Sequence, residues 1–311
     1  MKPLLTLLIG LACLMCAPAR AADMKPQQLG PHSWYVMGAA GMASSANEGF
    51  MSNAGFVVTA DGVIVFDALG TPALGEQLIA EIRKLTDRPI RRVIVSHYHA
   101  DHYYGLQAFK AIGAEVWAHR AGRDALTSDA AQARLAQRRA DLFPFVDANT
   151  RLMPADLWLE GDTDFRYGGL TIRLRHLGPS HAPDDLSMEV VEDKVIFAGD
   201  MLFRGRVPFV GDADTAHWLQ ALERLIEARA KVVVPGHGPA STDPQADLVL
   251  TRDYLRYLRD TMGRAVSELK SFDEAYAETD WRRWEALPAF REANRANAYN
   301  VFLQMEKGSL K

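Results

Sequence analysis

The chain has 311 residues, of which 48% are hydrophobic and 24% are charged, as in an ordinary soluble globular protein. Its formal net charge is −4 and its pI is near 6.1. No long basic run is present, so the sequence lacks the electrostatic footprint of a nucleic-acid-binding protein. We therefore expect no nucleic-acid partner.

The N-terminal segment has the pattern of a secretory signal. A positively charged start precedes an apolar run over residues 4–15, and small residues at 17–22 offer A-x-A cleavage sites ending at Ala19 or Ala21. The run is shorter than the roughly twenty residues that span a bilayer. We expect residues 1–21 to be a signal peptide directing export to a bacterial periplasm or the medium, with no membrane anchor after cleavage. An uncleaved anchor is the alternative.

Both cysteines, Cys13 and Cys16, lie inside this segment. The mature protein would then contain no disulfide, and any metal in it would have no thiolate ligand.

The first half of the remaining chain alternates strand and helix patterns. Strands are expected where β-branched and aromatic residues cluster: 32–37, 53–59, 63–67, 92–96 and 115–118. An Asp-Gly turn joins the second and third of them into a hairpin. Helices are expected at 74–85, 104–112 and 119–139.

The second half repeats a strand-rich stretch and ends in helices. Strands are expected at 157–159, 163–167, 170–176, 186–191, 195–198 and 231–234, and an amphipathic helix at 215–228. From 243 onward the chain is helical and charged. We expect an α/β fold with two sheets face to face and helices outside, in one domain over 22–311 with a core at about 33–240 and a helical extension at 243–311.

The segment 96–102, Ser-His-Tyr-His-Ala-Asp-His, follows a buried strand directly. His97 and His99 point the same way while the backbone stays extended, whereas Asp101 and His102 arrive as the chain turns into a helix. This geometry can serve two adjacent metal ions, one per pair. The alternative is a surface loop that happens to be rich in histidine.

Three further polar residues stand at strand ends beside Gly or Pro: His181, Asp200 and His237. Such positions hold side chains rigidly near the edge of a sheet. Together with the segment 96–102 they make five histidines and two aspartates, a set suited to two zinc ions, with iron or manganese also possible.

The order of these motifs resembles the metallo-β-lactamase superfamily, from about residue 33 to 238. The resemblance rests on His-Tyr-His-Ala-Asp-His at 97–102, His181, Gly-Asp at 199–200 and Pro-Gly-His-Gly at 235–238. It implies an αββα sandwich with the site at one edge, between the sheets. It also implies ligand roles: His97, His99 and His181 for the first metal, Asp101, His102 and His237 for the second, Asp200 bridging both, and Asp67 supporting a ligand from behind.

Within the superfamily, the sequence favours some branches over others. One subclass of true β-lactamases uses a cysteine at the second metal, which this mature chain lacks. The context Ala-Gly-Asp-Met-Leu-Phe around Asp200 is similar to glyoxalase II-type thioesterases, and His99 stands where flavodiiron oxidoreductases carry an acidic residue. The residue sequence at 96–106, together with the expected signal peptide and C-terminal helices, resembles that of exported quinoprotein relay system zinc metallohydrolases.

The ligand set predicts a zinc-dependent hydrolase acting on a small molecule. Two zinc ions about 3.5–4 Å apart share a bound water and lower its pKa. The resulting hydroxide would attack the carbonyl of an ester, thioester, lactone or lactam, with Asp101 orienting it and carrying a proton. No protein nucleophile is required, in keeping with the absence of a G-x-S-x-G motif.

Four residues near the ligands are candidates for substrate binding. Arg204 and Arg206 could hold a carboxylate, or form a solvated basic loop. Tyr98 and Tyr103 could line the pocket, or pack beneath it.

Several rival functions share part of the motif set. A β-lactamase would hydrolyse antibiotics through the same ligands, and a persulfide dioxygenase-like enzyme would use a single iron. A nuclease would need a basic surface, and a non-catalytic zinc-binding role would tolerate missing ligands. The substrate and the oligomeric state stay open.

Overall fold

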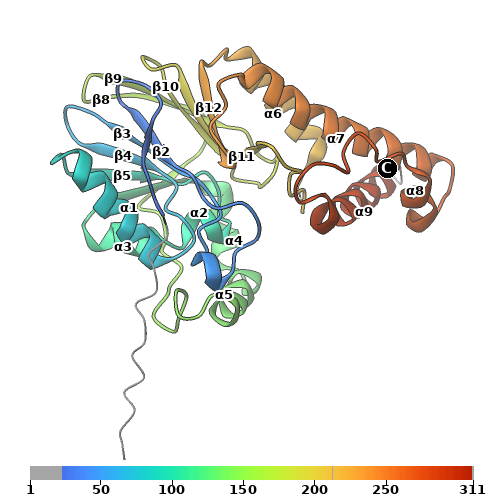
Figure 1. Ribbon diagram of the computed structural model, residues 1–311, viewed down its shortest axis with the longest axis horizontal. Coiled ribbons are helices and arrows are strands. Elements are labelled where there is room, and N and C mark those ends of the chain that lie inside the picture. Colours follow the sequence, from blue (N-terminus) through green and yellow to red (C-terminus); the bar gives the residue numbers. More distant parts are fainter. Residues whose placement is uncertain (1–22, 212, 310–311) are drawn as a thin grey trace, which may run out of the picture.

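The computed structural model describes residues 23–211 and 213–309. The predicted signal peptide and both cysteines lie outside the described residues. Two sheets form the centre of the molecule, with helices on their outer faces (Figure 1). The predicted α/β sandwich with additional C-terminal helices is therefore confirmed.

The first sheet has seven strands in sequence order among the described residues. They are β1 (Gln27–Gln28), β2 (Ser33–Val36), β3 (Ala54–Val58), β4 (Val63–Phe66), β5 (Ile90–Ile94), β6 (Glu115–His119) and β7 (Leu157–Leu159). The β3–β4 pair is the antiparallel hairpin expected around the Asp-Gly turn, and β4 to β7 run parallel.

The second sheet has five strands, in the order β12-β11-β10-β9-β8. They are β8 (Thr163–Tyr167), β9 (Leu170–His176), β10 (Leu186–Val190), β11 (Val195–Phe203) and β12 (Val232–His237). All pairs are antiparallel except β11 with β12, which is parallel. The carboxyl ends of β11 and β12 therefore meet at one edge of the sheet.

Helices cover both outer faces (Figure 1). Those of the first half are α1 (Pro72–Leu85), α2 (Ala100–Tyr103), α3 (Leu106–Ala111), α4 (Arg123–Thr127) and α5 (Asp129–Asp141), with short 3-10 turns at Ser45–Asn47 and Arg120–Gly122. Those of the second half are α6 (Thr215–Glu227), α7 (Pro244–Ser267), α8 (Phe272–Glu278) and α9 (Phe290–Ser309). No helix in 23–211 or 213–309 is long and apolar enough to cross a membrane.

Two expected helices differ from their predicted bounds. The helix expected at 104–112 is α3, which begins only at Leu106. The residue before it, Gly105, donates its N–H to the Leu69 carbonyl at 2.9 Å and lies so close to Ala68 that a Cβ would sit 1.8 Å from the Ala68 carbonyl oxygen. The stretch 119–139 divides at Ser128, which has extended backbone and caps α5 by accepting a hydrogen bond from the Ala131 N–H.

Strand alternation divides the apolar side chains between separate cores. In β4, Val63 and Val65 face α1 and α3, whereas Ile64 and Phe66 face the second sheet. In β11, Ile196 faces the helices α6 and α7. This period of two follows from the pleat of a strand, which sends successive side chains to opposite faces.

The C-terminal helices continue the core that covers the second sheet. Side chains of α7, α8 and α9 cluster with Met201, Leu202 and Trp218 in one buried apolar group. In Figure 1 these helices extend beyond the end of the sandwich, on the side of β11. The helical extension thus packs against the strand that leads into the predicted site.

Phe197 joins the two sheets and provides a test of this packing. Its ring is fully buried, lies 5.8 Å from the Phe66 ring and fills the space beside Gly55. We expect Phe197→Ala to lower the free energy of unfolding by about 3–5 kcal/mol, because it leaves a cavity between the sheets. Chemical denaturation measures this. Phe143→Ala is the control: its side chain is 69% exposed, and a change above about 0.5 kcal/mol there would mean that burial does not decide the effect.

Candidate metal centre

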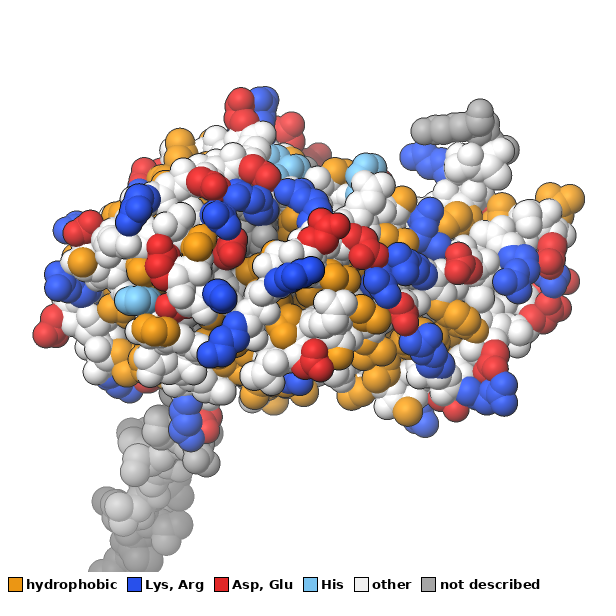
Figure 2. Space-filling model, turned by 90° about the horizontal axis from the view of Figure 1, so that it is seen from above, with side chains coloured by type: hydrophobic (Ala, Val, Ile, Leu, Met, Phe, Trp, Pro, Cys, Tyr) orange, Lys and Arg blue, Asp and Glu red, His pale blue; other side chains and the backbone are white. Residues whose placement is uncertain are grey.

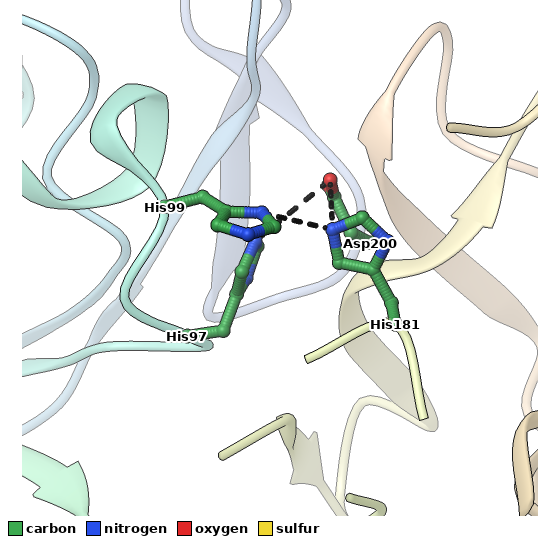
Figure 3. Close-up of side chains that lie close together, drawn as sticks. All are labelled: His97, His99, His181 and Asp200. Carbon is green, nitrogen blue, oxygen red and sulfur yellow. Dashed lines mark hydrogen bonds and ion pairs between the residues drawn. The ribbon is translucent and has the colours of Figure 1, made fainter. Parts of the chain in front are cut away.

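Four of the predicted ligands come from both sheets and meet at the edge between them. His97 and His99 follow β5 on extended backbone, and His181 lies in the loop after β9 (Figure 3). Nε2 of His181 is 3.0 Å from Nδ1 of His99. With Asp200, near the middle of β11, these residues bring one ligand atom each within 4.8 Å of one another.

A second group lies beside the first. Asp101 and His102 stand in the first turn of α2, and His237 ends β12. Oδ2 of Asp101 is 3.5 Å from Nε2 of His102 and 3.3 Å from Nε2 of His237. The backbone therefore turns from strand to helix between the two groups, and separates their side chains as the sequence predicted.

Asp200 lies between the groups and presents one oxygen to each. Its Oδ2 is 3.2 Å from Nε2 of His181 and 3.8 Å from Nε2 of His97. Its Oδ1 is 3.1 Å from Nε2 of His102 and 3.3 Å from Nε2 of His237. A carboxylate in this position can bridge two cations.

The donor set fits metal ions by geometry and by chemistry. Tetrahedral ligands about 2.0–2.1 Å from zinc lie about 3.3–3.4 Å from each other, close to the spacings of these atoms. Nε2 of His97, Nε2 of His102 and Oδ1 of Asp200 are buried and make no hydrogen bond within the described part of the chain. Buried polar atoms left in this state are costly, and cations coordinated by them would remove that cost.

The mutual electrostatics favour ionised carboxylates beside neutral histidines in the first group. Burial opposes ionisation of Asp200, but the facing His237, His102 and His181 outweigh it and hold the pKa of Asp200 well below its usual range. Burial and the neighbouring His181 lower the pKa of His99 to about 3. Neutral imidazole and carboxylate are the forms that bind metals.

Asp67 fixes two of the ligand-bearing segments from behind. Its Oδ2 is 2.8 Å from Nδ1 of His102 and accepts from the Ser96 hydroxyl at 2.8 Å, and its Oδ1 accepts from the Ser96 N–H at 2.7 Å. Ser96 Oγ is in turn 2.9 Å from Nδ1 of His97. The remaining nitrogens of both rings are thereby directed toward Asp200.

Two backbone carbonyls anchor the other ring nitrogens. Nδ1 of His181 is 3.0 Å from the carbonyl oxygen of Phe209, and Nδ1 of His237 is 2.9 Å from that of Met51. Every residue has a backbone carbonyl, so these two contacts could not be predicted from the sequence.

The C-terminal helix α9 holds the loop that supplies the first of these carbonyls. The Asn297 side chain accepts a hydrogen bond from the Val210 N–H and donates one to the Pro208 carbonyl, on either side of Phe209. Asn297 is only 1% exposed. The helical extension is therefore coupled to the orientation of His181.

Gly236 is required by the close approach of Asp200. A Cβ at this position would lie 1.9 Å from Oδ1 of Asp200. Asn53, which the sequence analysis did not single out, donates to the carbonyls of Pro235 and Gly238 and so ties this turn to the first sheet.

The four candidate substrate residues occupy different environments. Tyr98 is half-buried beside the centre, with its ring 4.8 Å from the His99 ring and Arg134 5.4 Å above it. Tyr103 is 1% exposed and its hydroxyl donates to the Met153 carbonyl, so it offers no surface to a ligand and follows the second alternative, packing beneath the pocket.

The two arginines differ although they are two positions apart. Arg204 donates to Oδ2 of Asp247 at 2.6 Å and to the Ala240 carbonyl at 3.2 Å, so it neither faces a substrate nor forms a solvated loop, the two alternatives that the sequence left open. Arg206 lies over the Phe203 ring at 6.0 Å, and its Nε is buried with no hydrogen-bond partner among the described residues.

Asp184 is a buried acid that the sequence analysis missed. It is 2% exposed, and its Oδ1 makes no hydrogen bond to the described chain. Burial raises the pKa of Asp184 to about 8. Only its position three residues after His181 in the sequence indicates proximity to the site.

The fold and the centre together define a class of protein: an αββα sandwich with two His- and Asp-rich groups that could hold metal at the edge between its sheets. The family model described as the metallo-beta-lactamase superfamily matches residues 47–237. The chain belongs to this superfamily.

Individual relatives agree with that assignment. A linear primary-alkylsulfatase from a Pseudomonas species is 25% identical over 250 residues, covering 69% of this chain and 47% of that protein, so the chain spans about half the length of this relative. A metallo-beta-lactamase from Pontibacter korlensis has a TM-score of 0.59 at 22% identity, covering 75% of this chain and 99% of its own. The sec-alkylsulfatase Pisa1 from Pseudomonas sp. has a TM-score of 0.68 at 18% identity, covering 90% of this chain and 50% of its own.

The bond from Asp67 to His102 leads to a prediction on metal affinity. We expect Asp67→Asn to weaken binding of metal at the Asp101–His102–His237 group by about 10- to 100-fold, because the amide holds the imidazole less firmly. Titration against a chromophoric chelator measures it. Asp193→Asn is the matched control, since Asp193 pairs with His32 at 2.9 Å outside the centre; equal losses in both variants would refute a specific role for Asp67.

Asp184 leads to a prediction on stability against pH. Its pKa rises from 3.8 in the unfolded chain to about 8 in the fold, so the unfolded state releases the proton first and stability falls as pH rises between these values. We expect Asp184→Asn to remove this loss. The Tm of the variant relative to the unmodified protein should then increase between about pH 5 and pH 8, measured by differential scanning fluorimetry; a constant difference would contradict the assignment.

Proposed function

We propose that the chain is a hydrolase that uses two zinc ions to cleave an ester, thioester, lactone or lactam of a small molecule. The observation that carries this proposal is the division of Asp200 between the two ligand groups, one oxygen to each. A site for one metal would not require it. His97, His99 and His181 would hold one ion, and Asp101, His102 and His237 the other.

When bound, the two ions supply a Lewis acid for the carbonyl oxygen and lower the pKa of a bound water. The residues of the chain keep the site ordered around that chemistry. The side chain of Asp101 is 17% exposed and that of Asp200 is 5% exposed. Asp101 therefore reaches the open side of the centre, where it can orient water and carry a proton to the leaving group.

The two serines next to ligands in the sequence, Ser96 and Ser180, are not available as nucleophiles. Both are buried, and their hydroxyls donate to Asp67 and to the Leu177 carbonyl. Acidic and basic side chains are intermixed on the face in Figure 2, and the net charge is −4. These features support a small-molecule substrate and give no support to a nucleic-acid partner.

Sulfate ester hydrolysis is a second candidate, supported by how much of the chain the alkylsulfatases match. Residues 1–242 make up less than four fifths of the chain, so the match to Pisa1 over 90% of it includes part of the helical extension. The match to the lactamase covers 75%. Part of the helical extension thus has a counterpart in the fold of a sulfatase.

Export to the periplasm remains part of the proposal and rests on the sequence of residues 1–21. Fractionation of cells producing the full chain tests it: the processed protein should be released with the periplasm, and retention of an unprocessed form in the cytoplasm would contradict it.

Removing one ligand tests the hydrolytic proposal. We expect purified protein to bind two zinc ions per chain and to cleave at least one of nitrocefin, a lactone, a thioester or a primary alkyl sulfate. Asp101→Ala and His99→Ala should each lower metal content and reduce hydrolysis by at least about 100-fold, since each removes a donor from the centre. Elemental analysis and steady-state kinetics measure the two effects.

His217→Ala is the control, because that imidazole is exposed and pairs with Asp214 away from the centre. Retained hydrolysis in a variant that has lost its metal would contradict the proposal. A single iron per chain with oxygen consumption would favour the dioxygenase alternative instead.

A further inference from the structure

Arg206 is a cation without an anion partner at the edge of the metal centre. Its guanidinium carbon lies 6.0 Å from the Phe203 ring centroid, and that ring stacks on His237 at 5.0 Å with an interplanar angle of 9°. No described carboxylate oxygen lies within 4.0 Å of it, and its buried Nε donates to no described atom. Arg206 is half-buried, and its buried Nε–H is costly to leave unpaired unless a ligand accepts from it.

The electrostatics of the surroundings point in the same direction. Burial lowers the pKa of Arg206, while the carboxylates of Asp200, Asp101 and Glu292 act on it in the opposite sense, so it lies within electrostatic reach of the centre. Guanidinium stays charged throughout the physiological range. Once Asp200 and Asp101 coordinate cations, only Glu292 of these three still compensates Arg206, and it makes no ion pair with it within 4.0 Å. An incoming anion then becomes a favourable partner.

The neighbouring Arg204, in the same loop, has hydrogen-bond partners within the protein. It makes a 2.6 Å bond to Asp247 and a second to the Ala240 carbonyl. Arg204 therefore stabilises the loop, and Arg206 remains available.

An apolar surface stands next to this cation. The Phe209 side chain is 48% exposed, and its ring is 6.4 Å from the His181 ring. The backbone carbonyl of Phe209 orients His181, and this contact does not involve the exposed ring. Arg206 and Phe209 are three positions apart in the loop after β11, where Arg206 lies over the Phe203 ring and Phe209 lies beside the His181 ring.

We propose that Arg206 is the residue that selects substrates carrying an oxyanion group, a carboxylate or a sulfate, and that Phe209 contacts an apolar chain attached to it. The inference rests on the proposed hydrolytic function and names its substrate class: anionic esters with an apolar portion. A guanidinium donates two parallel hydrogen bonds to either oxyanion. An alkyl chain packed against the exposed ring of Phe209 would remove apolar surface from water, which is favourable.

The kinetic test compares two esters that differ only in terminal charge: mono(para-nitrophenyl) glutarate, which carries a carboxylate, and para-nitrophenyl pentanoate, which is neutral. The ratio of their kcat/KM values is independent of how much protein is folded. We expect the ratio to fall by about 10- to 100-fold in Arg206→Gln, the effect of losing a charge-assisted pair. Arg204→Gln carries the same charge change and should keep the ratio within about twofold. If the ratio is unchanged in Arg206→Gln, Arg206 does not recognise a substrate carboxylate that is remote from the bond being cleaved.

A binding test gives a readout that needs no turnover. Octanesulfonate resembles an alkyl sulfate but cannot be hydrolysed, and methyl octyl sulfone is its neutral counterpart. Calorimetry on the zinc-loaded protein should show octanesulfonate binding more weakly to Arg206→Gln by a similar factor, with methyl octyl sulfone less affected. Equal weakening of both ligands, or none, overturns recognition of a sulfate-type head group.

Phe209→Ala tests the apolar contact, since it removes the ring but keeps the carbonyl that orients His181. The preference for octanesulfonate over ethanesulfonate should decrease in this variant, and an unchanged preference contradicts the contact. If neither ester is cleaved by the unmodified protein, carboxylic ester hydrolysis fails while calorimetry still decides the role of Arg206.

Discussion

The structure depends on one arrangement: the carboxylate of Asp200, buried between five histidines and a second aspartate at the edge where the two sheets meet. Each of its oxygens faces one group of ligands. The first sheet supplies His97 to His102, and the second supplies His181, Asp200 and His237. Nε2 of His97, Nε2 of His102 and Oδ1 of Asp200 are buried and make no hydrogen bond among the described residues. Cations between the two groups would remove the cost of burying these atoms. The fold brings the two sheets to this edge and the packed core holds them there.

The support of the centre comes from outside the ligand set and from both halves of the chain. Asp67 links His102 to Ser96 on the side of the first sheet. On the other side, Asn297 of α9 holds the backbone around Phe209, whose carbonyl orients His181. The C-terminal helices therefore do more than cover the second sheet. Asn297 of α9 holds the loop that carries Arg206 and Phe209. If Arg206 selects anionic substrates as proposed, the helical extension contributes to that selectivity.

Sequence patterns predicted the parts of the molecule that depend on local chemistry. The hairpin at β3–β4, the alternating strands and the capped helix α1 follow from residue periodicity and turn residues, and the ligand segment follows from the density of histidine after a buried strand. The separate roles of Arg204 and Arg206 could not be predicted, because they depend on Asp247, which is distant in sequence. The contacts of the Phe209 and Met51 carbonyls with His181 and His237 could not be predicted either, because every residue has a backbone carbonyl. Tyr103 adjoins a ligand in sequence, yet the helical turn directs its ring into the core.

Anomalous diffraction from crystals of the zinc-loaded protein, recorded on both sides of the zinc absorption edge, would show whether the seven side chains form two metal sites that share Asp200. We expect two zinc peaks, one among His97, His99 and His181 and one among Asp101, His102 and His237, with Asp200 contacting both. A single peak at full zinc saturation, or two peaks with Asp200 bound to only one, would contradict it.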